Sequence, residues 1–118
     1  WEDSRSGAQV LYFVRLDAAG ARIGADTVLS TRLFTPWNLV WTGAGYGLAW
    51  TDSRDGNLEI YFARLDASGV RVGTDLRVTN DPAMSRAPSL AWTGSTYGVA
   101  WGDLRDGNWE IYFAPICP

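Results

Sequence analysis

The chain repeats itself about every fifty residues, and this feature most constrains its fold. The central copy starts at Trp50 and reads WTDSRDGNLEIYFARLDA, with related copies that start at Trp1 and Trp101. A second block, LVWTG at Leu39, returns as LAWTG at Leu90. Periods of this length are typical of solenoids, propellers and arrays, in which each repeat is one supersecondary unit that needs its neighbours.

Each copy has the pattern of β-strands. Short segments of β-branched, aromatic and aliphatic residues alternate with glycine-containing turns such as Asp55-Gly56, and none is long enough for a typical helix. The expected strands of one repeat span residues 89–93, 97–102 and 109–114, with the fourth strand at 73–79 of the preceding copy. Pro115 and Pro118 disfavour a regular strand around Cys117, whose thiol we expect to be exposed. The sequence therefore predicts an all-β fold of β-propeller blades, each a four-stranded antiparallel sheet.

The chain contains about two and a half such repeats. Residues 1–31 supply the last two strands of one blade, residues 37–79 a complete blade, and residues 88–114 the first three strands of another. Apolar residues occupy both faces of the segment 58–65, as expected for a sheet covered on both sides. We expect a single partial propeller region over residues 1–118, part of a longer polypeptide or, less favoured, a protomer that assembles with other copies through open blade edges.

One family resembles this repeat. The segment SRDGNLEIY at Ser53, the RLDASG at Arg64 and the LRVTND at Leu76 are similar to the repeat of TolB-type (WD-like) β-propellers. The resemblance covers nearly the whole chain, because residues 4–17 and 104–113 match the same core. It implies the propeller fold and an extracellular or periplasmic location. The turn WTGST at Trp92 departs from the family's W-S-P-D-G, so TolB's partners are not carried over, and fold analogy assigns no function.

Composition excludes several activities. The sequence has no histidine and one cysteine, which rules out Ser-His-Asp chemistry, an internal disulfide and a thiolate metal cluster. Its net charge is −3 and its arginines are dispersed, which argues against a nucleic-acid partner. No apolar run approaches the roughly 18 residues of a membrane helix. We expect a non-enzyme with no cofactor, no metal and no membrane span.

The acidic residues do not restore an enzymatic or calcium site. Asp52, Asp55 and Asn57 suggest a calcium loop, but Arg54 occupies a ligand position and the glycine is out of register, so a hairpin turn is preferred. Glu59 and Glu110 occupy equivalent repeat positions, which a ring would hold far apart. An acid–base pair is therefore unsupported.

A Trp-x-Asp-x-Arg triplet recurs in every copy. Its alternate spacing directs the side chains to one strand face, and two interpretations are open. The triplet is either a repeated ligand pocket or, as its recurrence favours, a structural cluster in which Asp accepts turn amides and Arg bridges to the next blade. The triplets are Trp50, Asp52 and Arg54; Trp101, Asp103 and Arg105; and Trp1, Asp3 and Arg5.

Residues that break the repeat are the better ligand candidates. Trp37 and Trp109 are tryptophans where the aligned residue is not aromatic, although either could fill a gap between blades. Asp81, Met84 and Arg86 lie in the longer connection between repeats, where propellers carry binding loops. The sequence predicts a non-catalytic scaffold or protein-interaction module. The alternatives are a carbohydrate-binding propeller lectin that uses exposed tryptophans and, more weakly, a non-catalytic part of a glycosidase.

Overall fold

The computed structural model describes residues 1–3, 10–30 and 34–117. They form ten strands in three sheets, and every strand pair is antiparallel. The N-terminal sheet contains β1 (Glu2–Asp3), β2 (Val10–Leu16) and β3 (Arg22–Ser30). The middle sheet contains β4 (Phe34–Trp41), β5 (Gly45–Asp52), β6 (Glu59–Asp66) and β7 (Arg71–Arg77). The C-terminal sheet contains β8 (Ser85–Trp92), β9 (Tyr97–Asp103) and β10 (Glu110–Ile116).

The all-β, antiparallel expectation is confirmed, and the complete repeat is a four-stranded sheet in the order β4-β5-β6-β7. Within the described residues, the three sheets do not close into a ring. The same residues contain no helix that could cross a membrane.

Two local expectations need correction. β1 was not expected, because its two residues are too few to show a strand pattern; it pairs with β2 through Glu2 and Leu11. The expectation of no regular strand around Cys117 is confirmed at Cys117 itself but was wrong for the residues before it, since β10 continues through Ile116 and places Pro115 opposite Gly98. β10 is an edge strand, where a residue without an N–H can be accommodated.

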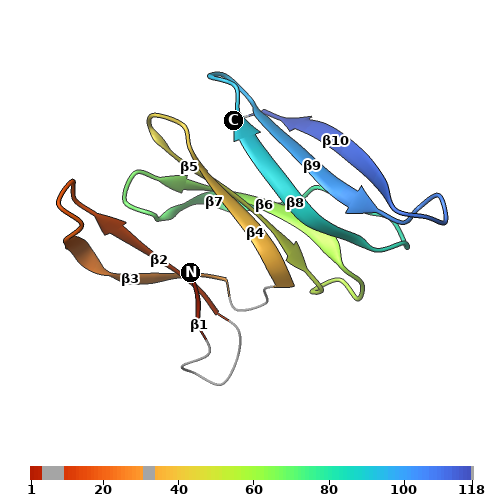
Figure 1. Cartoon of the computed structure of the whole chain (residues 1–118), viewed down its shortest axis with the longest axis horizontal. Helices are drawn as coiled ribbons and strands as arrows, with labels where there is room; N and C mark the ends of the chain where they lie inside the picture. Colours follow the sequence, from red (N-terminus) through yellow and green to blue (C-terminus); the bar gives the residue numbers. More distant parts are fainter. Residues whose placement is uncertain (4–9, 31–33, 118) are drawn as a thin grey trace.

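The middle sheet lies between the other two, and apolar side chains on both of its faces are buried against them (Figure 1). One apolar cluster joins it to the N-terminal sheet and includes Leu11, Phe13 and Trp50. A second cluster joins it to the C-terminal sheet and includes Phe62 and Trp101. Two apolar faces on one sheet explain why its strands lack a clear inside–outside alternation.

The two junctions between sheets use the same contact at repeat-equivalent positions. Phe13 of β2 meets Tyr46 of β5 edge to face, with ring centroids 5.2 Å apart. Phe62 of β6 meets Tyr97 of β9 with centroids 4.8 Å apart. The three sheets therefore stack head to tail, each presenting its phenylalanine to the tyrosine of the next.

Candidate functional site

The Trp-x-Asp-x-Arg clusters of the middle and C-terminal sheets share one geometry around a fully buried carboxylate. The Trp50 indole N–H donates to Asp52 Oδ2 at 3.0 Å, and the Arg54 backbone N–H donates to Asp52 Oδ1 at 2.7 Å. The Arg54 guanidinium adds Nε at 3.0 Å and Nη2 at 2.7 Å. The C-terminal sheet repeats the contacts to Asp103 from Trp101 Nε1 at 3.0 Å, Arg105 N at 2.8 Å, Nε at 3.0 Å and Nη2 at 2.7 Å.

Each arginine of these clusters also covers an aromatic ring. The Arg54 Cζ lies 4.2 Å from the Tyr61 ring centroid, and the Arg105 Cζ lies 4.1 Å from that of Tyr112. Each tyrosine stacks in turn on the tryptophan of its own cluster, with centroids 6.0 and 6.2 Å apart. A cation over an aromatic face is favourable, so charge and ring hold one another in place.

Both carboxylates are held in the charged form. The Arg105 guanidinium keeps the pKa of Asp103 well below its usual 3.8; burial opposes this, and the Trp101 indole assists it. At Asp52, burial is the largest influence and raises the pKa, but hydrogen bonds from Arg54 and Trp50 together lower it. A carboxylate so fully bonded is poorly suited to act as a base or nucleophile.

These bonds support the structural interpretation of the triplets, which stays a prediction. Among the described residues, the second partner of Arg54 is Asp75 of β7, in its own sheet, at 3.2 Å, and not a residue of the next sheet as expected. A different arginine, Arg71, makes a contact between sheets by donating to the Leu29 carbonyl of β3. In the first copy, Trp1 stacks on Tyr12. Asp3 lies in β1, and Arg5 lies outside the described residues.

The two repeat-equivalent glutamates do not meet. Glu59 is fully buried and accepts hydrogen bonds from Thr79 Oγ1 and, at 3.1 Å, from Asn57 Nδ2. Glu110 is exposed at the start of β10 and accepts a bond from Asn108 Nδ2 at 2.9 Å. Glu59 also accepts a bond from Arg77 Nη2 at 3.3 Å, so it ties its hairpin to the end of β7.

Asp81 builds the connection between β7 and β8. Its carboxylate accepts the Ala83 backbone N–H at 2.9 Å, and its carbonyl accepts Asn57 Nδ2 at 3.0 Å. These bonds tie the connection to the hairpin between β5 and β6. Asp81 is therefore used within the fold.

Arg86 and Trp109, two of the sequence candidates, do lie together. The Arg86 Cζ is 4.4 Å from the Trp109 ring centroid, which places a cation over one face of the indole. Trp109 remains partly exposed beside Ile111 and Phe113, on the face of the C-terminal sheet directed away from the middle sheet. This exposed strip is apolar with one positive charge.

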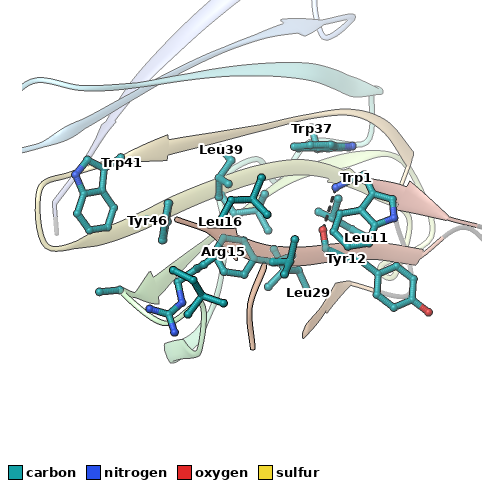
Figure 2. Close-up of a pocket in the computed structure, with 15 residues that line it drawn as sticks. Trp1, Leu11, Tyr12, Arg15, Leu16, Leu29, Trp37, Leu39, Trp41 and Tyr46 are labelled. Atoms are coloured by element: carbon teal, nitrogen blue, oxygen red, sulfur yellow. Dashed lines mark hydrogen bonds between the residues drawn. The ribbon is translucent and has the colours of Figure 1, made fainter. Parts of the chain in front are cut away.

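Trp37 lies at the other junction, in an aromatic pocket of about 560 Å³ between the N-terminal and middle sheets (Figure 2). Its indole N–H donates to Glu2 Oε1 at 2.6 Å. β4 and β5 provide one wall, with Leu39, Trp41 and Tyr46 (Figure 2). The opposite wall comes from Trp1 and the first sheet, including Leu11, Tyr12, Arg15, Leu16 and Leu29.

The pocket walls are covered at the equivalent junction. Leu90 and Tyr97 of the C-terminal sheet, which correspond to Leu39 and Tyr46, are buried against the middle sheet. Trp41 is 51% exposed, whereas Trp92 at the equivalent position packs against the second cluster. The pocket thus occurs where the N-terminal sheet has only the short β1.

Among the described residues, no group of three or more metal-ligating side chains comes together. Cys117 carries an exposed free thiol. An aromatic pocket lies at one end of the stack, and an exposed apolar sheet face lies at the other.

Sequence reasoning missed Leu39, Trp41 and Tyr46 as pocket residues. These residues occur in both copies of the repeat, so the sequence indicates that they belong to the core. Their equivalents in the next copy do lie in or against the second apolar cluster.

Comparison of the chain with models of known protein families, with curated proteins and with solved structures finds no match.

Proposed function

We propose that this chain is a non-catalytic module of a β-propeller, in which each sheet is one blade and the stack serves as a scaffold or protein-interaction surface. The proposal is supported by the head-to-tail repetition of the junction between sheets, with Phe13 against Tyr46 and Phe62 against Tyr97. Each sheet has the same two contact faces, so a sheet at the end of the stack can bind a further sheet until both of its faces are covered.

The observation that carries the proposal is a difference between repeat-equivalent residues. Ile60 and Phe62 of β6 are 0% and 3% exposed beneath the C-terminal sheet. Their counterparts on β10, Ile111 and Phe113, are 80% and 67% exposed. Burying one such side chain contributes about 1.5–3 kcal/mol, so an open face of this kind favours association. We infer that another sheet of the same repeat covers it, in a larger propeller or through other copies of the chain.

Solution mass tests this proposal. We expect the purified 13.0 kDa chain to associate in a concentration-dependent way in sedimentation velocity. Ile111→Glu and Phe113→Glu should each shift it to monomer, because a charge would be buried in the contact. Val70→Glu is the matched control, since Val70 is an exposed apolar residue in the hairpin between β6 and β7. A wild-type chain that stays monomeric and behaves like Ile111→Glu would contradict the proposal.

A carbohydrate-binding propeller is the second candidate, and the exposed indole of Trp41 at the aromatic pocket favours it. Aromatic side chains offer an apolar face and a polar edge, which suits a sugar ring. A glycan array separates the two functions: saturable binding lost in Trp41→Ala, Trp37→Ala or Trp109→Ala supports the lectin. An array without binding, together with association through Ile111, supports the scaffold.

A further inference from the structure

We propose that the aromatic pocket is the acceptor for a β-hairpin with the residue pattern of Asn38–Ala49, supplied from outside residues 1–118. This segment, called the repeat hairpin below, has the sequence NLVWTGAGYGLA and joins the ends of β4 and β5 in the middle sheet. The inference rests on the proposed stacking function and names the partner at the end of the stack opposite to Ile111.

The repeat hairpin of the middle sheet shows how such a partner would dock. Its Asn38 Oδ1 accepts the Leu90 backbone N–H of the C-terminal sheet at 3.0 Å. Val40 and Ala49 pack into the cluster that joins these two sheets. Gly47 lies against the Tyr97 ring, and a Cβ at this position would come within 2.4 Å of the ring. The hairpin thus meets the next sheet through one amide, two apolar side chains and one bare backbone position.

The pocket presents the same receiving residues without a hairpin on them. Leu39 and Tyr46 are the repeat equivalents of Leu90 and Tyr97, and both line the pocket. The second junction also repeats the contact between Tyr46 and Trp41, whose ring centroids are 4.8 Å apart, against 4.7 Å for the equivalent pair. The two rings of the first junction therefore have the same arrangement as their counterparts beneath the docked hairpin.

The edge of β2 is open where the hairpin would add a strand. In the middle sheet, Gly45–Ala49 pairs with residues 62–66 of β6 throughout. In the N-terminal sheet, β1 pairs with β2 only at Val10 and Leu11, and Trp1 continues the ladder as far as Tyr12. Among the described residues, none pairs with this edge of β2 beyond Tyr12. An open edge can receive a strand by backbone hydrogen bonding, and alternate side chains then set its register.

The pocket suits this occupant better than a second copy or a glycan. In a second copy, both such hairpins are already paired within their own sheets, through β6 and through β10. Most of the residues that line the pocket are apolar or aromatic, and Arg15 is the one charged side chain among the lining residues described. A glycan would leave its hydroxyl groups poorly matched, whereas the buried face of the hairpin is Val40, Gly47 and Ala49.

The test attaches the repeat hairpin to the full chain. NLVWTGAGYGLA is fused directly before Trp1, which recreates the junction Ala49-Trp50 and supplies a high effective concentration. Amide hydrogen exchange across residues 13–16 of β2 is measured with and without the fusion. We expect exchange there to slow by about tenfold or more, because an unpaired edge becomes part of a ladder.

Two fused variants separate specific docking from adsorption. Both substitutions are made in the fused copy only, at the residues that correspond to Gly47 and Ala44. The Gly47→Ala fusion should lose the protection, because the new methyl group would clash with the Tyr46 ring as a Cβ at Gly47 would with Tyr97. The Ala44→Ser fusion should keep it, because Ala44 is exposed in the hairpin turn. Equal protection by the native and Gly47→Ala fusions, no protection by either, or glycan binding abolished by Trp41→Ala would each overturn the inference. Association through Ile111 is measured on a different face, so it stands or falls separately.

Discussion

The Tyr97 ring of one sheet lies directly against Gly47 of the sheet before it, so closely that a Cβ at Gly47 would come within 2.4 Å of the tyrosine Cε1. Phe62 borders the same point at 3.1 Å. The absence of a side chain on β5 thus sets how closely the middle and C-terminal sheets approach.

Gly47→Ala should destabilise the chain by about 1–3 kcal/mol, the usual cost of forcing an extra methyl group into a filled site. Chemical denaturation followed by circular dichroism measures the change. Gly102→Ala is the control, because a Cβ there meets its nearest neighbour at an ordinary 3.4 Å. Similar unfolding free energies for the two variants would contradict the steric account.

Repeat-equivalent isoleucines should respond unequally to truncation. Ile60→Ala should cost about 2–5 kcal/mol, because Ile60 is fully buried between two sheets. Ile111→Ala should change the unfolding free energy of the monomer by less than about 0.5 kcal/mol, because its side chain is exposed. Denaturant titration at low protein concentration compares them, and equal costs would show that another surface already covers β10.

Asp103→Asn should cost about 2 kcal/mol, because it removes the charge from hydrogen bonds donated by Arg105 and Trp101. Glu110→Gln is the control, since that carboxylate is exposed and accepts its bond from Asn108, outside the cluster. Thermal unfolding of both variants measures the difference. A loss no larger than that of Glu110→Gln would mean that the cluster contributes little to stability.

Acid should weaken the fold through the two buried carboxylates. The pKa values of Asp52 and Asp103 are lowered from 3.8, so below that pH the unfolded chain binds more protons than the folded one. Their contribution is complete above the unfolded pKa and is lost as the pH falls toward the folded values. Denaturation midpoints measured between about pH 2.5 and 7 should decline at the acidic end. The decline should be smaller in the double variant Asp52→Asn, Asp103→Asn.

The sequence by itself determined the features that depend on residues close along the chain. The repeat, the alternation of strands and turns and the Trp-x-Asp-x-Arg pattern are local, and they predicted antiparallel hairpins that the structure contains. The contact between Trp50 and Asp52 needs only two residues of one strand and the turn that follows. Residue spacing predicts such contacts because alternate side chains of a strand point to the same face.

The tertiary structure alone decided which copies of a repeated residue are core and which are surface. Ile60 and Ile111 occupy equivalent positions, as do Tyr97 and Tyr46, yet only the first of each pair is buried. Burial depends on whether a neighbouring sheet lies on that face, and this contact joins residues far apart in sequence. The same cause separates Trp37 from Trp109, one in the aromatic pocket and the other beside Arg86. Identical local patterns acquire different roles because their neighbours differ.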